Sequence, residues 1–195
     1  MFEFDGILAL EKMERAVLKV KERLLRATGA LERAGIPYAV VGGNAAGAWI
    51  EQVDETAVRS TQDVDLAIRR DDLEAVKVAL AAVGFIYRHA APIDTFLDGP
   101  DAKARDAVHI LFAGERVRPD DLAAVPDVTE FTSFTTFRVI ALESLVQMKL
   151  TSFRLKDRMH LRDLIGVDLI DATWPARYPP ELAARLQSLL DNPDG

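Results

Sequence analysis

Cysteine is absent from this chain of 195 residues. Its absence excludes a disulfide scaffold, a thiol nucleophile and any zinc or iron–sulfur site held by cysteine. A bound metal would therefore need oxygen or imidazole ligands. Long apolar runs are missing too: the longest stretch without charge, Ala34 to Ile50, falls short of the ~20 residues of a membrane helix and contains a proline and two adjacent glycines. No membrane span is expected.

Positive charge is in deficit, since 24 Lys and Arg face 31 Asp and Glu, which gives a formal net charge of −7. This balance argues against a protein that coats duplex DNA, although it leaves room for a locally basic pocket for one triphosphate. The first five residues carry acids where a secretory signal would carry Lys or Arg, so a cytoplasmic location is expected. The length suits a single domain over residues 1–195.

The hydrophobic pattern predicts an N-terminal helix within 1–34, a core over 36–140 and a helical tail over 141–195. The first helix carries an apolar stripe at alternating spacings of three and four, which favours packing on the protein's own core over a coiled-coil seam. The stripe consists of Leu10, Met13, Val17, Val20, Leu24, Ala27 and Leu31.

The core is expected to be an α/β (α+β) fold with a mixed, mostly antiparallel sheet that the N-terminal and C-terminal helices enclose. Apolar, partly β-branched runs predict strands at 38–41, 63–68, 85–89, 94–97, 107–112 and 135–140. Helical periodicity predicts helices at 44–52, 72–83, 142–153, 159–165 and 180–190.

A glycine pair, Gly42-Gly43, lies between the first predicted strand and the helix that follows it. Glycine lets the backbone turn tightly and lets a phosphate approach the amides, and a helix N-terminus presents unpaired N–H groups and a positive dipole end. A tight turn alone would also explain the pair. The pattern therefore indicates a phosphate site only in combination with other residues.

Two aspartates, Asp63 and Asp65, are separated only by an apolar residue at the start of a buried strand. Residues two apart on a strand point to the same face, so the two carboxylates are held close together and repel each other. A hard divalent cation such as Mg²⁺ would turn that repulsion into coordination. A solvated strand edge is the other interpretation.

Together these residues form motifs that resemble those of the nucleotidyltransferase superfamily, whose members share a glycine-pair turn and a D-x-D metal site. The shared motifs are Gly42-Gly43-Asn44-Ala45 and Arg59-x-Thr61-x-Asp63-x-Asp65. The second motif is similar to that of the bacterial branch that includes nucleotidyltransferase toxins of type IV toxin–antitoxin systems. The helical segment after the catalytic core of that branch resembles Met148-Lys149-Leu150 and Arg154-x-Lys156-Asp157.

The resemblance implies a nucleotidyltransferase-like mixed β-sheet flanked by helices, with a C-terminal helical segment. It implies a metal-dependent transfer of a nucleoside monophosphate from a nucleoside triphosphate (NTP) to an unknown acceptor, which would be tRNA, a protein or a small molecule. Asp63 and Asp65 would hold Mg²⁺, with Mn²⁺ as an alternative, and pyrophosphate would leave.

Seven further residues would bind the nucleotide by the same resemblance. The start of the first core helix, at Gly42, Gly43 and Asn44, would cradle the phosphates. Thr61 would orient the carboxylates, while Arg59 would brace the loop, contact a phosphate or form no more than a surface ion pair. Lys149 and Lys156, which are seven residues apart, are expected on one helical stripe where they neutralise the triphosphate or form a solvated face.

One position departs from the family pattern, because a third carboxylate is usual on a later strand and the polar residue within the strand at 107–112 is His109. Asp106 has the opposite parity and should point to the other face. His109 would be a general base, a ligand for a softer metal, the mark of a site that has lost catalysis, or a core residue. A catalytically degenerate protein of this fold, which binds nucleotide or a partner, is therefore the alternative function.

Overall fold

The computed structural model describes residues 6–90, 93–103 and 106–192. The expected N-terminal helix and C-terminal tail therefore extend, at 1–5 and 193–195, outside the described residues. A seven-stranded sheet with the order β3-β4-β5-β2-β1-β7-β6 forms the centre of the fold. Its strands are β1 Ala39–Val41, β2 Val64–Ile68, β3 Ile86–Ala90, β4 Ile93–Leu97, β5 Ala107–Phe112, β6 Phe131–Ser133 and β7 Arg138–Ile140.

Strand pairing is mixed and mostly antiparallel, as expected, because only β1–β7 and β2–β5 are parallel. The sequence predicted β5 to the residue. The strand expected at 135–140 is shorter than predicted and pairs with β6, which was not predicted. All three residues of β6 are exposed. Because neither face of this strand is buried, its sequence lacks the alternation of apolar and polar residues that predicts a strand.

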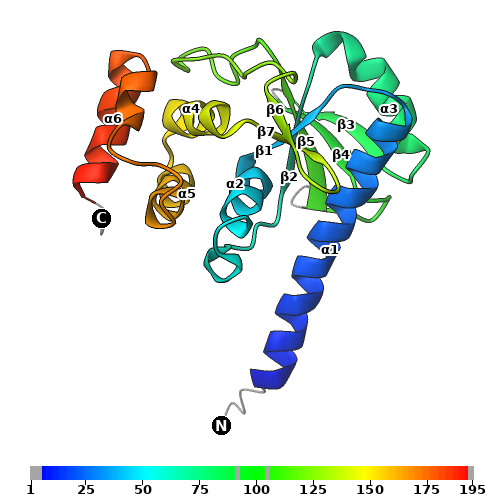
Figure 1. Ribbon diagram of the computed structural model, residues 1–195. Helices are drawn as coiled ribbons and strands as arrows, with labels where there is room; N and C mark the ends of the chain where they lie inside the picture. The colour runs from blue at the N-terminus through cyan, green and yellow to red at the C-terminus, as the bar shows by residue number, and fades with distance from the viewer. Residues whose placement is uncertain (1–5, 91–92, 104–105, 193–195) are drawn as a thin grey trace.

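The α-helices are α1 Gly6–Arg33, α2 Gly42–Glu51, α3 Leu73–Ala81, α4 Leu142–Ser152, α5 Leu155–Gly166 and α6 Pro180–Asp191. The end of α1 and α3 cover one face of the sheet, and α2 covers the other face over β1 and β2 (Figure 1). None of these helices is both long and apolar enough to cross a membrane, within the described part of the chain.

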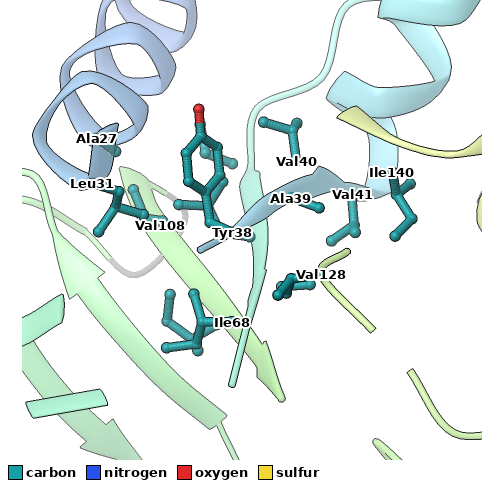
Figure 2. Packing of buried hydrophobic residues seen from close by; sticks show 14 of the residues in the cluster. Ala27, Leu31, Tyr38, Ala39, Val40, Val41, Ile68, Val108, Val128 and Ile140 are labelled. Carbon is teal, nitrogen blue, oxygen red and sulfur yellow. The ribbon is translucent and has the colours of Figure 1, made fainter. Parts of the chain in front are cut away.

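The main core lies between the sheet and α1. Figure 2 shows Ala27 and Leu31 of α1 facing Tyr38 and Val108, and all four residues are fully buried. Burying a large apolar side chain contributes about 1.5–3 kcal/mol to folding. This packing fixes the C-terminal half of α1 on the sheet and thereby the strand β1 that follows it.

The N-terminal half of α1 does not pack as expected. Leu10, Met13 and Val17 of the apolar stripe are 62%, 64% and 48% exposed, and this half of the helix extends away from the body (Figure 1). The reason is length: a helix of 28 residues is about 42 Å long, whereas a strand of six residues spans about 20 Å. The sheet can cover only part of the stripe.

The C-terminal helices also differ from the expectation: α5 packs on α2 and α4, α6 packs on α4 and α5, and neither helix encloses the sheet. They form a second apolar core with Ile50 at the end of α2. In addition, α5 begins at Leu155, four residues before the predicted start. The second core places α5 beside α2, where it can contribute side chains to the start of that helix.

Candidate functional site

The backbone turn at Gly42 holds the carboxylate of Asp65. Gly42 has φ +70°, and a Cβ built on it would lie 2.0 Å from Oδ2 of Asp65. Strand pairing brings them together, since Val41 is the antiparallel partner of Asp65. Only glycine can leave this space. The preceding residue, Val41, has no polar side chain to cap α2, so the first amides of the helix are available to an anion.

The segment that leads into β2 lies against the start of α2. Asn44 donates a hydrogen bond from Nδ2 to the backbone oxygen of Asp63, at 2.7 Å. The side chain of Thr61 is beside Gly43, where a Cβ would come within 2.9 Å of its hydroxyl oxygen. Asp63 is partly buried and directly precedes β2. The structure therefore brings the glycine pair and the D-x-D motif to one place.

His109 lies beside the same carboxylate. In the parallel pairing of β2 with β5, Asp65 is the partner of His109, and the ring Nδ1 is 3.3 Å from Oδ1 of Asp65. Both side chains are partly buried. Asp106, in contrast, forms an ion pair with Arg23 of α1, on the opposite side of the sheet. The only polar residue of β5 is thus the one that faces the D-x-D motif.

The donor set at this place suits a hard cation that is shared with a substrate. Among the described residues, no three His, Cys, Asp or Glu side chains are grouped so that they could hold a metal ion. Mg²⁺, however, is commonly bound by one or two carboxylates together with substrate phosphates and water. Asp63 and Asp65 supply two carboxylates, and Gly42 leaves the space that the Asp65 carboxylate occupies. These residues fit Mg²⁺ or Mn²⁺ bound with a triphosphate.

Lys149 lies in α4 and is buried, with 5% of its surface exposed. Its ammonium group is 3.2 Å from Oδ1 of Asp157. Burial lowers the pKa of Lys149, and the negative charges of Asp157 and Asp65 oppose that effect. Burial also raises the pKa of Asp157, but Lys149 and the hydrogen bond from Ser152 outweigh it, so that pKa is lowered. This cation is therefore held next to the site by a buried partner.

Lys149 and Lys156 do not share a helical stripe, which corrects the prediction from their spacing. Phe153 adopts a left-handed conformation with φ 46° and ends α4, and the exposed Lys156 belongs to α5. The carboxylate of Asp157 accepts a hydrogen bond from the backbone N–H of Arg154 and thereby caps the start of α5. Spacing by seven implies a shared face only in an unbroken helix.

Arg59 forms an ion pair with Asp163 of α5, with 2.6 Å between Nε and Oδ2. The hydrogen bond to Asp163 raises the pKa of Arg59. This ion pair links the loop before β2 to α5, and the Arg59 side chain in it is 55% exposed. A contact of Arg59 with a phosphate stays a prediction.

His160 of α5 is a neighbour of the site that the sequence did not indicate. Its Cε1 would lie 3.5 Å from a Cβ on Gly43, and its Nδ1 is buried without a hydrogen-bond partner in the described part of the chain. Burial and the positive charge of Lys149 lower the pKa of His160 to about 4, so the ring is neutral at pH 7. The helical spacing of Asp157, His160 and Asp163 on α5 was the available signal.

Among the described residues, the sheet face that carries Asp65 has an open half over β5, β4 and β3, where α2 does not pack. Strand pairing continues from Asp65 to His109 on β5, to Thr95 on β4 and to Arg88 on β3. Directly paired residues point to the same face, and α2 packs on this sheet against β1, β2 and β7. Thr95 is partly buried and Arg88 is exposed. A molecule that reaches His109 can therefore lie on β5, β4 and β3.

Sequence comparison matches the chain to no protein-family model and to no curated protein. Solved structures do resemble it. An antigenic nucleotidyltransferase-like protein from Paracoccidioides brasiliensis is 19% identical, with a TM-score of 0.58 over 90% of this chain and 89% of that protein. This similarity shows that the chain has a nucleotidyltransferase-like fold, as the motifs predicted.

Two further structures resemble the chain more weakly. The antibiotic-resistance factor ANT(2'')-Ia is 13% identical with a TM-score of 0.47, over 90% of this chain and 89% of that protein. The protein JHP933 from Helicobacter pylori is 19% identical with a TM-score of 0.44, over 97% of this chain and 76% of that protein.

Proposed function

We propose that this protein is a metal-dependent nucleotidyltransferase that moves a nucleoside monophosphate from an NTP to a hydroxyl group of an acceptor. The observation that supports this most strongly is the contact of Gly42 with Asp65. It combines, in one place, a left-handed glycine at an uncapped helix start and a carboxylate of the D-x-D motif. The first feature suits phosphate and the second suits the cation that accompanies it.

In the proposed reaction, the start of α2 binds the triphosphate through backbone N–H groups. Asp63 and Asp65 would hold Mg²⁺ or Mn²⁺, which would offset the phosphate charge and polarise the α-phosphoryl group. The acceptor oxygen forms a bond to the α-phosphorus while the bond to the bridging oxygen of pyrophosphate breaks. His109, which lies beside Asp65, would take the proton of the acceptor hydroxyl.

The acceptor would approach over the open half of the sheet, because this surface adjoins His109. Lys149 would add positive charge near the phosphates from its buried place in α4. The acceptor class stays tRNA, a protein or a small molecule. The motif resemblance makes a toxin of a type IV toxin–antitoxin pair, acting in the cytoplasm, the biological setting that we propose.

A second candidate function is a degenerate protein of the same fold that binds a nucleotide or a partner without transfer. The observation that favours it is His109, which is paired with Asp65 at the position where a third carboxylate is expected. Imidazole is a poor ligand for Mg²⁺. The two functions share the phosphate turn and differ in what His109 does.

The experiment that tests both functions combines binding with transfer. The melting temperature is measured with ATP, GTP, CTP and UTP, each with Mg²⁺ or Mn²⁺, and α-labelled NTPs are incubated with protein and cell lysate. Transfer of label by the wild type, but not by Asp65→Asn, supports the enzyme. Stabilisation without transfer supports the binding protein. A melting temperature that responds to none of the eight combinations contradicts both functions as nucleotide-binding proteins.

A further inference from the structure

Arg23 of α1 is a buried cation, with 3% of its surface exposed, at the edge of the candidate site. Its guanidinium group has three partners. Nε is 3.1 Å from a carboxylate oxygen of Asp98, Nη2 is 3.5 Å from one of Asp106, and Nη1 donates to the backbone oxygen of Gln62 at 3.3 Å. A buried arginine is costly unless its donors are paired, and here every nitrogen has a partner.

The three partners belong to the segments that carry the site. Gln62 directly precedes Asp63, Asp106 directly precedes β5 with His109, and Asp98 directly follows β4. Because β2 and β5 are parallel while β4 and β5 are antiparallel, these three chain positions meet at one end of the sheet. One guanidinium group therefore connects them.

Arg23 holds the chain before β2 from the side opposite to α2. Its contact is with the carbonyl of Gln62, whereas the side chain of Asn44 in α2 binds the next carbonyl, that of Asp63. The carbonyls of Gln62 and Asp63 belong to the two peptide groups that flank the α-carbon of Asp63, so α1 and α2 each hold one of these peptides.

Packing alone does not fix this end of the sheet. A cavity of about 450 Å³ lies between α1 and the segment after β4, and polar or charged residues such as Lys19, Glu22 and Asp101 line it beside Arg23. Arg26, one turn along α1, also binds Asp98, but its side chain is 41% exposed.

We propose that Arg23 is a positioning residue for the phosphate and metal site, which acts by holding the peptide at Gln62–Asp63 against the start of α2. This inference rests on the proposed function for its effect on nucleotide binding. Its effect on the chain before β2 is independent of that function and is measured without nucleotide.

The test compares three variants of the full chain. Arg23→Met removes the guanidinium group and keeps a long side chain, while Arg23→Lys keeps the charge without the forked donors and guards against a failure of Arg23→Met to fold. Arg26→Met is the matched control, because it removes a partner of the same Asp98 without a contact to Gln62. Amide hydrogen exchange is measured for residues 61–65 without ligand, and calorimetry measures binding of NTP with Mg²⁺.

Both Arg23 variants are expected to exchange faster than Arg26→Met at residues 61–65. They should also bind NTP with Mg²⁺ roughly tenfold to 100-fold more weakly, since removing a group that positions a metal ligand has effects of this order on affinity. The melting temperature should fall further in the Arg23 variants than in Arg26→Met, because Arg23 is buried and Arg26 is exposed. Exchange at residues 61–65 is therefore compared with exchange in β1 of the same variant. Equal exchange and equal affinity in all three variants would overturn the inference. If the wild type binds no NTP but exchange still rises only in the Arg23 variants, the proposed function fails and the positioning of the chain stands.

Discussion

Replacement of Gly42 by alanine tests the contact on which the site depends. The new Cβ would lie 2.0 Å from Oδ2 of Asp65, and Gly42 has a positive φ. Gly35 provides a matched control. Its φ of +66° is nearly the same, and nothing lies within 4 Å of a Cβ built there. Gly35→Ala therefore imposes the backbone strain without the contact.

The magnitudes follow from these two positions. A left-handed conformation costs a residue with a Cβ about 1–2 kcal/mol, and the loss of glycine's freedom in the unfolded chain returns about 0.4–1 kcal/mol. Gly35→Ala should therefore lower the free energy of unfolding by about 1 kcal/mol. Gly42→Ala must also displace the Asp65 carboxylate from His109, which adds about 1 kcal/mol for the lost contact.

Urea unfolding measures the free energies of both variants, and calorimetry measures binding of NTP with Mg²⁺. Gly35→Ala should bind as the wild type does, while Gly42→Ala should bind roughly 100-fold more weakly because a carboxylate ligand has moved. The reasoning is refuted if the two variants lose the same stability and retain the same affinity. That result would show that the carboxylate does not depend on the space at Gly42.

Three further predictions concern single side chains. Asp63→Ala should abolish the rise in melting temperature with NTP and metal, and should leave the ligand-free protein equally or slightly more stable because carboxylate repulsion is relieved; unfolding would show that the pair is structural. His109→Asp should keep or raise Mg²⁺-dependent transfer and His109→Ala should remove it, whereas activity indifferent to both changes would assign His109 to the core. Burial lowers the pKa of His160 to about 4, so as pH falls the unfolded chain binds the proton before the folded protein does. The free energy of unfolding should therefore decrease between about pH 6.5 and pH 4, by up to about 3 kcal/mol more than in His160→Gln. Equal pH slopes of the unfolding free energy in the two proteins would contradict the burial of this ring.

The sequence pattern predicted those elements of the fold that interactions between neighbouring residues determine. The apolar run of β5 and the turn at Gly42 have their own signals in the sequence, because burial and glycine geometry act over a few residues. The D-x-D motif and the glycine pair were predicted to serve one site, and strand pairing places Asp65 on Gly42. Their chemical roles stay predictions.

Side-chain contacts between different helices and strands could not be predicted from local sequence patterns. The burial of Lys149 in α4 depends on its ion pair with Asp157, which belongs to the next helix, α5. The buried position of Arg23 depends on three segments that follow it by 39 to 83 residues. Such pairings follow from the assembled sheet, and spacing along the chain does not encode them.

The most direct test of the proposed function is a crystal structure with a non-hydrolysable NTP analogue and Mg²⁺ or Mn²⁺. We expect a cation bonded to carboxylate oxygens of Asp63 and Asp65, at about 2.0–2.1 Å for Mg²⁺, with the triphosphate on the first amides of α2. The α-phosphorus should lie on the open half of the sheet and face His109 there. A nucleotide bound away from Gly42, or a cation that touches neither aspartate, would contradict it.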